Sequence, residues 1–277
     1  MSPVFHFQGH ALGVAGTMRL PFQEVIETQA SSVLSTAGGY ASAEVKDFRY
    51  RDILKFDRAQ TLVTGSRLAD LEEEGSDPKR VHSTLIQAVV EGFDLLGMVT
   101  ADRIEAHIVS KHVSGGIGEP EVRLKGTRFE GLKIGGNRIK VDLAVDELDA
   151  HPTHTTFRNG YSAGQFAGLF QMTEAQVNSC PDAVKRFLRY PYTKSPEELP
   201  AINGITNFSM VRTLEPEAKT DGYWGHVFYI KGFGTVRLGE INISALTRSV
   251  TMLQVDMGSP MEATFMASSG EDGGSDW

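Results

Sequence analysis

Apolar and polar residues alternate along most of the chain, in short runs that glycines separate. After Gly38-Gly39, for example, Ala41, Ala43 and Val45 alternate with polar residues, and residues 58–68 form a run rich in threonine and valine. A period of two residues places one side of a strand in a core and the other toward solvent. The pattern predicts a mainly β protein, either an antiparallel β-sandwich or a flattened barrel.

In three places the alternation changes phase by one residue. In VTADRIEAHIVSKH, residues 99–112, Val99 and Ala101 share one face, and the next apolar residues, from Ile104 to Ile108, share the other. The change falls at Asp102-Arg103, where we expect a β-bulge, because one extra residue turns the following side chains over. An α-helix with a stripe from Leu95 to Ile108 is the alternative for this segment.

The same change of phase recurs near the C-terminus. It lies at Gly239-Glu240 in GTVRLGEINIS and between Met252 and Leu253 in SVTMLQVDM. Three such changes favour long, strongly bent strands over helices.

Turns and loops are marked by their residue types. Gly135-Gly136-Asn137 between Ile134 and Ile139 predicts a tight turn joining two strands. The acidic stretch from Asp70 to Arg80 lacks the alternate-position spacing of a calcium loop, so we interpret it as a solvated hairpin loop. The glycine-rich stretch from Ser114 to Pro120 has no helix after it and is interpreted as a hairpin loop, not a phosphate cradle.

The strand pattern stops near residue 147 and resumes near residue 207. Here Thr173 is a candidate helix N-cap, Pro181 suits the first turn of a second helix, and Val184, Phe187 and Leu188 form a helical apolar stripe. We therefore divide the chain into a first β-sandwich part at 1–146, a mainly helical insertion at 147–207, a second β-sandwich part at 208–267 and a flexible polar tail at 268–277.

Composition narrows the classes of partner and cofactor. The formal net charge is −8 and lysines and arginines are scattered among acids, so nucleic acid is not an expected partner. No stretch approaches the roughly 20 apolar residues of a membrane helix, and no cofactor motif is present. The N-terminal stretch lacks the features of a signal peptide, so a cytoplasmic location is the default expectation. Export by a route that needs no signal peptide is also compatible with the sequence.

The single cysteine, Cys180, rules out an internal disulfide and a cysteine-based zinc site. We expect it to be a small, buried, apolar residue of a helical segment.

Histidines supply the main alternative chemistry. His151 and His154 stand three residues apart in HPTHTT, and His226 follows the insertion, so a three-histidine metal site is conceivable. Pro152 and the threonines instead favour a polar loop, in which case His151→Ala and His154→Ala each leave folding and activity nearly unchanged. Glu105 and His107 are expected on the solvated face of their strand, because the apolar residues Ile104, Ala106 and Ile108 occupy the other face.

Aromatic residues gather within the insertion and in the β segment that follows it. Aromatics on a β surface either pack over a core or receive a partner's side chain, so we take these as the candidate binding residues: Phe166, Phe170, Phe187, Tyr190, Tyr223, Trp224 and Tyr229.

The order of several segments resembles the choice-of-anchor P family of predicted bacterial surface proteins. The segments are GHALGVAG near the start, VTADRIEAHI, RFEGLKIGGNRI, and GTVRLGEINI followed by VTMLQVDM. The resemblance implies an all-β module joined to a variable anchor and carries no catalytic residues. The chain departs from the family in the extra region from Ser162 to Pro200 and in its lack of an export signal and anchor, which puts a surface location in doubt.

These observations favour a non-enzymatic structural or binding module that acts through protein–protein contact or self-assembly, with another protein or itself as partner in a homo-oligomer. We expect the insertion to carry the specific function on a β scaffold. The alternative is a β-barrel metal-dependent enzyme or small-ligand carrier that uses His151, His154 and His226.

Overall fold

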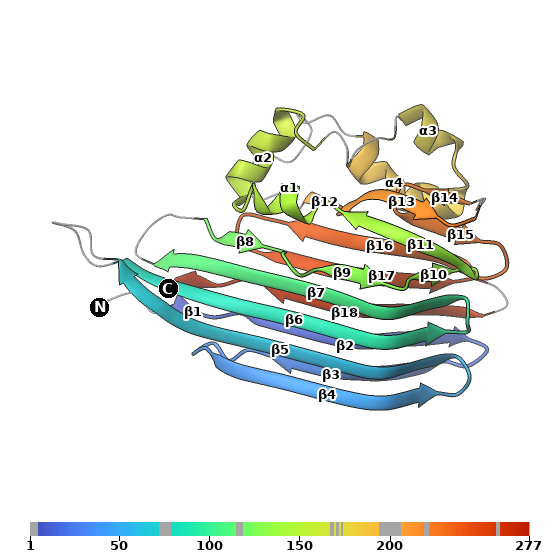
Figure 1. The fold of residues 1–277 in the computed structure, drawn as a ribbon, viewed down its shortest axis with the longest axis horizontal. Coiled ribbons are helices and arrows are strands. Elements are labelled where there is room, and N and C mark those ends of the chain that lie inside the picture. Colours follow the sequence, from blue (N-terminus) through green and yellow to red (C-terminus); the bar gives the residue numbers. More distant parts are fainter. Residues whose placement is uncertain are drawn as a thin grey trace.

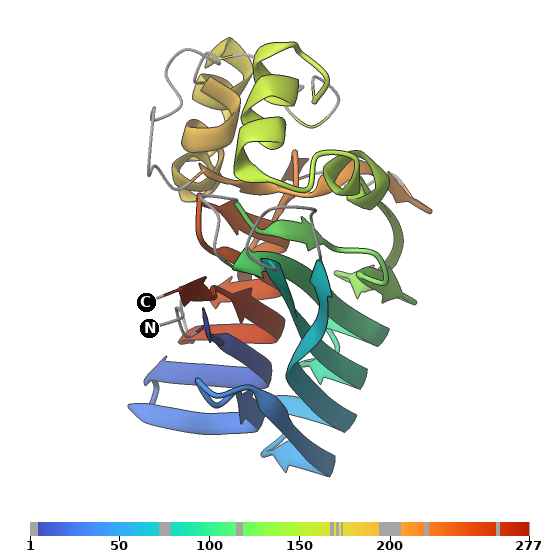
Figure 2. The same cartoon turned by 90° about the vertical axis from the view of Figure 1, so that its left-hand side faces the viewer.

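A computed structural model shows two antiparallel β-sheets packed face to face, with helices at one edge (Figures 1 and 2). The structure describes residues 5–71, 79–114, 119–166, 169, 172, 174–193, 206–218, 222–258 and 261–276. The fold is therefore a mainly β sandwich, as the alternation predicts.

The first sheet has the order β13-β11-β10-β7-β6-β5-β4, with β8 and β9 also paired to β7. Its strands are β4 (Gly39–Tyr50), β5 (Leu54–Leu71), β6 (Lys79–Leu95), β7 (Val99–Ser114), β8 (Glu121–Arg123), β9 (Arg128–Glu130), β10 (Lys133–Ile134), β11 (Asn137–Leu143) and β13 (Val211–Pro216). The predicted turn is confirmed, since Ile134 pairs with Asn137 across Gly135 and Gly136, both at positive φ.

The second sheet has the order β14-β15-β16-β17-β18-β2-β3, with β12 paired to β16. Its strands are β2 (Gly9–Leu20), β3 (Glu24–Val33), β12 (Thr206–Ser209), β14 (Tyr223–Trp224), β15 (Val227–Ile230), β16 (Gly234–Ile243), β17 (Arg248–Met257) and β18 (Glu262–Asp272).

The two long edges of the sandwich differ. At one edge β12 belongs to the second sheet and β13 to the first, so the chain crosses between the sheets at Met210. The helices lie beyond this edge: α1 (Val145–Asp149), α2 (His154–Ser162), α3 (Glu174–Ser179) and α4 (Asp182–Thr193). At the opposite edge β3 and β4 lie side by side without a helix (Figure 1).

The predicted helices occur where the strand pattern stops. Pro181 directly precedes α4, whereas Thr173 lies outside the described residues. Within the described part of the chain, no helix is long and apolar enough to cross a membrane.

The inward–outward alternation of side chains breaks once in each of five neighbouring strands of the first sheet, and the breaks lie on one line across the sheet. In β4, β5, β6, β7 and the β9 region, two successive side chains point outward where the strand bends. One residue of each outward pair lies on a line that crosses the strands, as the strand register shows. These residues are Asp47, Asp57, Gly92, Asp102 and Gly131. Alternate members of this line, Asp47, Gly92 and Gly131, have positive φ.

The second sheet carries a matching line with the opposite orientation. Here two successive side chains point inward in β2, β16, β17 and β18. The line runs through Ala30, Gly13, Ser268, Met252 and Gly239, and again the first, third and fifth members have positive φ. Two outward positions in one sheet and two inward positions in the other bend both sheets the same way.

The three predicted changes of phase are therefore confirmed, but the predicted extra residue at Asp102-Arg103 is wrong. The register of β6 and β7 is continuous from Leu95↔Val99 to Arg80↔Ser114. Each neighbouring strand changes phase at the same line, so no strand needs an additional residue. The helical alternative for residues 95–108 is excluded by β7.

The predicted flexible tail at 268–277 is also wrong up to residue 276. β18 continues to Asp272, and β19 (Ser275–Asp276) pairs with β1 (Phe5–His6). Ser268 is fully buried, and its hydroxyl crosses to the first sheet, where it donates to Ala88 O and accepts from Ala106 N, both at 2.8 Å. Small polar residues looked solvated in the sequence, but here they fill the narrow space between two backbones.

A layer of buried polar side chains lies beneath β1, at the end of the sandwich where β1 and β19 pair. His82 and His112 are register partners beneath Phe5, whose ring stacks on His82 at 4.3 Å. His112 Nε2 lies 3.6 Å from Asp272 Oδ2, and Asp272 is 1% exposed. Asp272 pairs in register with Arg248, whose pKa is lowered by burial to about 10.

Candidate functional site

Helices α3 and α4 form a small second core on the outer side of the second sheet. Its buried members are Val177, Cys180, Val184, Leu188 and Val227. Phe187, Trp224 and Tyr229 pack against it, so the fold brings three of the candidate aromatics together. Cys180 is buried as expected, and burial raises the pKa of its thiol.

The other candidate aromatics do not join this cluster. Phe166 is buried against Phe157 and His151 on the α2 side. Tyr223 stacks on Phe228 and stays 36% exposed. Phe170 and the Tyr190 side chain lie outside the described residues.

An ion-pair network lies under α4 on the outer face of the second sheet. Arg237 in β16 donates two hydrogen bonds to Glu240, at 2.8 and 2.7 Å, and a third to Asp256 at 3.2 Å. His226 Nε2 lies 3.5 Å from Glu240 Oε1. Burial alone would raise the pKa of Glu240, but His226 and Arg237 outweigh it and the pKa lies below its usual value.

A pocket of about 480 Å³ opens beside this network, between α4 and the ends of β2, β16, β17 and β18. Phe187 forms part of its wall. The guanidinium carbon of Arg237 lies 4.3 Å from the centroid of the Phe187 ring, and that of Arg186 lies 4.4 Å from it. The helix thus places one aromatic ring in contact with two cations.

Sequence reasoning missed Arg186, Arg237 and Glu240. Arg237 and Glu240 occupy outward positions of β16, which the alternation assigns to solvent. Only the position of α4 over this strand makes them part of a site. The signal available in the sequence is weak: an arginine directly before Phe187 in an amphipathic helix.

The structure does not bring the three candidate metal-binding histidines together. His226 faces Glu240, whereas His154 Nδ1 lies 4.0 Å from Glu119, and His151 Nδ1 donates to Thr156 O. In the described ranges, no three His, Cys, Asp or Glu side chains are grouped so that they could hold a metal ion.

The loop-like context assumed for His154 is wrong. Thr153 caps α2 through a reciprocal hydrogen bond with Thr156, and His154 opens the helix with 5% exposure. Burial lowers the pKa of His154, although Glu119 opposes the shift. The premise of a harmless His154→Ala substitution therefore fails, while His151 is half-buried near Phe166.

The predicted solvated position of Glu105 is also wrong. Glu105 is 4% exposed, because Gln87, Arg103 and Arg128 surround its carboxylate at 2.6–3.0 Å. His107 is half-buried, since the loop at Gly126 and Thr127 lies over it. The Arg128 side chain of β9 and the loop between β8 and β9 cover a face that the alternation assigned to water.

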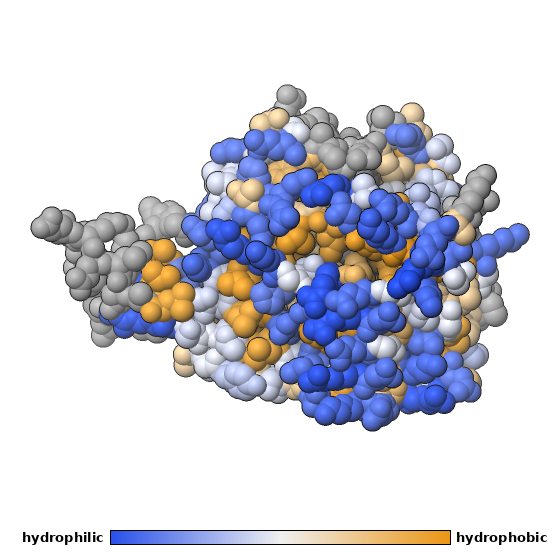
Figure 3. Space-filling view, viewed as in Figure 1, coloured by the Kyte–Doolittle hydropathy of each residue, from blue (hydrophilic) through white to orange (hydrophobic). Residues whose placement is uncertain are grey.

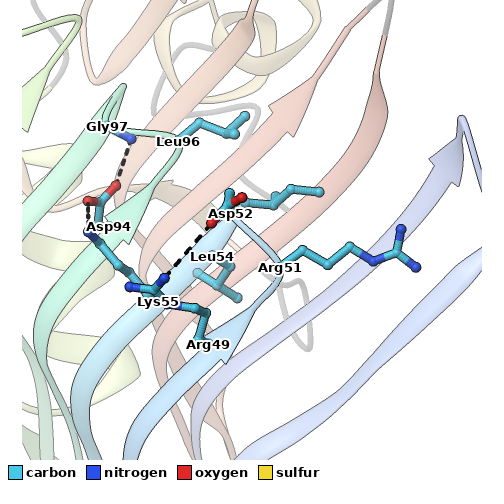
Figure 4. Close-up of a pocket in the computed structure, with 9 residues that line it drawn as sticks. Arg49, Arg51, Asp52, Leu54, Lys55, Asp94, Leu96 and Gly97 are labelled. Atoms are coloured by element: carbon cyan, nitrogen blue, oxygen red, sulfur yellow. Dashed lines mark hydrogen bonds and ion pairs between the residues drawn. The ribbon is translucent and has the colours of Figure 1, made fainter.

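A second hollow lies at the β4–β5 and β6–β7 turns (Figure 4). It has a volume of about 250 Å³, and its rim carries Arg49, Asp52, Lys55 and Asp94. Lys55 pairs with Asp94 at 3.1 Å and Arg49 with Asp52 at 3.9 Å. The charges of this small, turn-lined hollow are already paired, so it is a weaker candidate than the pocket at α4.

The free edge formed by β3 and β4 is the third candidate. Among the described residues β3 pairs only with β2, and β4 only with β5. Large apolar side chains are exposed on or near these strands: Leu20, Phe22, Val25, Val33 and Tyr40. Val25 and Tyr40 are 70% and 71% exposed, so this edge presents both unpaired backbone and apolar surface.

Comparison with known proteins gives a family but no function. No curated protein matches the chain, and no solved structure matches it. Residues 5–244 match one family, which covers both sheets except for the last strands. The chain belongs to that family, described as a domain of unknown function (DUF8256).

Proposed function

We propose that this protein is a structural module that associates with further copies of itself through the edge formed by β3 and β4. The observation that carries the proposal is that both sheets end at the same side of the molecule in long strands paired on one side only. An unpaired strand offers backbone donors and acceptors to a partner strand.

The geometry favours a second copy as the partner. β3 and β4 lie beside each other in different sheets, so a two-fold axis at this edge, perpendicular to the sheets, would pair β3 with β3 and β4 with β4 of another copy. Both sheets would then continue across the contact. The exposed side chains of Val25, Val33 and Tyr40 would lose solvent in the same step.

The two edge strands also limit this association. β4 carries Glu44, Lys46 and Arg49, and each edge strand contains one residue with positive φ, Asp47 or Ala30. Charges and irregular backbone on an edge oppose indiscriminate pairing. A contact of defined register, such as a dimer, is therefore expected in place of open-ended aggregation.

The test compares lysine substitutions of exposed apolar residues at the edge and away from it. Val33→Lys places a charge on β3, and Leu246→Lys places one in the β16–β17 turn, where Leu246 is 61% exposed. Light scattering after size exclusion, over a range of concentrations, should show that Val33→Lys weakens association by about tenfold or more.

Leu246→Lys should associate like the wild type, and far-UV circular dichroism should show both variants folded. A wild type that stays monomeric at every concentration would contradict the proposal. So would a Val33→Lys variant that assembles as well as the wild type.

A further inference from the structure

The pocket at α4 is a second feature that the edge contact does not use. Among the described residues, its charged groups divide into those that already have an ion-pair partner and one, Arg186, that does not. Arg237 is bound by Glu240 and Asp256, and Arg19 pairs with Glu262 at 3.0 Å. Within the described chain, Arg186 contacts the Phe187 ring and has no carboxylate at ion-pair distance.

Contact with the Phe187 ring restricts the Arg186 side chain, and among the described residues its guanidinium N–H groups have no hydrogen-bond acceptor. A guanidinium stacked on an aromatic ring keeps its in-plane N–H donors available, and these donors match the two oxygens of a carboxylate or phosphate. The carboxylates of the pocket, Asp256 and Glu262, are both engaged by arginines, so they compete weakly for Arg186.

Apart from Thr264, whose hydroxyl donates to Asp256, the rest of the pocket wall is apolar. Phe187, Met257 and Ala263 line it beside the charged groups. Its volume of about 480 Å³ falls within the range of about 300–1,000 Å³ that is typical of small-molecule sites. A ligand that fits these features has an anionic group at one end and an apolar body.

We propose that this pocket binds a small organic oxyanion, a carboxylate or phosphate ester attached to an apolar group, with Arg186 holding the anionic oxygens. Phe187 and Met257 contact the apolar part of the ligand. Arg237 supports the site indirectly. Its two carboxylate partners, Glu240 and Asp256, hold its guanidinium group against the Phe187 ring. The helical insertion would then contribute the specificity of the site and β16–β18 its floor.

The experiment uses the full chain and three probes of similar size. Phenylacetate and phenyl phosphate carry an oxyanion, and phenylacetamide has nearly the same shape as phenylacetate without the charge. Calorimetric titration and saturation-transfer NMR should detect at least one of the anions, at least about tenfold tighter than the amide. Whichever anion binds more tightly identifies the oxygen chemistry.

Two variants locate the binding. Arg186→Gln should weaken anion binding by about tenfold or more, whereas Lys185→Gln should leave it unchanged, because Lys185 pairs with Asp182 and does not line the pocket. Both substitutions lie on α4, so equal melting temperatures would show that the loss reflects binding. Equal affinity for phenylacetate and its amide, wild-type binding by Arg186→Gln, or no binding of either anion up to about 10 mM would overturn the proposal.

Discussion

The two sheets bend along matching lines, but they use opposite faces to do so. In the first sheet the line from Asp47 to Gly131 points outward, and in the second sheet the line from Ala30 to Gly239 points inward. Both lines alternate residues with positive and ordinary φ from strand to strand. The bend is therefore a property of the backbone. The types of side chain along it differ because one line faces water and the other faces the opposite sheet.

Their outer faces differ as well. An alternating series of charges crosses the first sheet beside its bend, from Glu44 through Arg58, Glu91, Arg103 and Glu105 to Arg128, with neighbouring pairs at 2.5–4.0 Å. In Figure 3 this face is densely hydrophilic in its lower and right-hand part. On the second sheet the outward residues of β2, β17 and β18 are mainly uncharged, and the partly buried charges of Arg237 and Glu240 lie under α4. An open face tolerates charges singly, whereas a covered face requires them to be paired.

The inward line should be the more sensitive of the two. Ser268→Val removes the hydroxyl that joins Ala88 O to Ala106 N and places a β-branched residue at φ 55°. Unpaired buried groups and backbone strain together should lower the free energy of unfolding by about 4 kcal/mol. Urea denaturation measures the change.

Ser268→Gly is the matched variant, because it loses the hydroxyl but accepts the backbone conformation. Its destabilisation should be about half as large. Equal stabilities of the two variants would show that the conformation at Ser268 is not strained for a branched side chain.

Substitution of the charges under α4 on the second sheet should have the second-largest effect on the free energy of unfolding. Glu240→Gln leaves Arg237 and His226 without their shared carboxylate and should destabilise the fold by about 3 kcal/mol at neutral pH. Because the pKa of Glu240 is lowered by folding, its contribution is present above the ordinary value of 4.5 and is lost as the pH falls through the lower folded value.

Unfolding free energies measured from pH 7 down to pH 3 should therefore show the wild type and Glu240→Gln converging in acid. A difference that stays constant over this range would mean that the carboxylate of Glu240 is not the stabilising group.

The outward line of the first sheet should tolerate change better. A Cβ at Gly131, where φ is 62°, would meet the exposed carboxylate of Asp102, which can rotate away, and would also lie 2.9 Å from the Asp102 Cβ, which cannot. Gly131→Ala should cost about 1–2 kcal/mol, chiefly from the left-handed backbone. In a double-mutant cycle, adding Asp102→Ala should recover only the part of this cost that is due to the clash; full recovery would assign the whole cost to the carboxylate.

The open charge series should have the smallest effect. Arg58 contacts Glu44 and Glu91 with a side chain that is 41% exposed. Arg58→Gln should lower stability by less than about 1 kcal/mol, and by less again in high salt. A loss comparable to that of Glu240→Gln would erase the contrast between the open and the covered face.

Much of the β architecture could be predicted from local patterns. The changes of phase at Asp102, Gly239 and Met252 located the bend in three strands before any partner strand was known, because the direction of a side chain follows from its position in its own strand. The Gly135-Gly136 turn and the helical stripe at Val184–Leu188 are local in the same sense. Of the candidate binding residues, Phe187, Trp224 and Tyr229 do share one cluster.

The sequence by itself determined which segments are strands, which are helical and where several strands bend, since polarity and turn chemistry act over a few residues. Only the tertiary structure decided that the bends align into two transverse lines, that Ser268 and Asp272 are core residues, and that Glu105 and His154 are buried. It also decided that α4 covers Arg237 and Glu240 and leaves a pocket at Arg186. The physical reason is that burial of a polar group depends on which distant segment supplies its partner atoms, and this information is absent from the group's own neighbourhood in the chain.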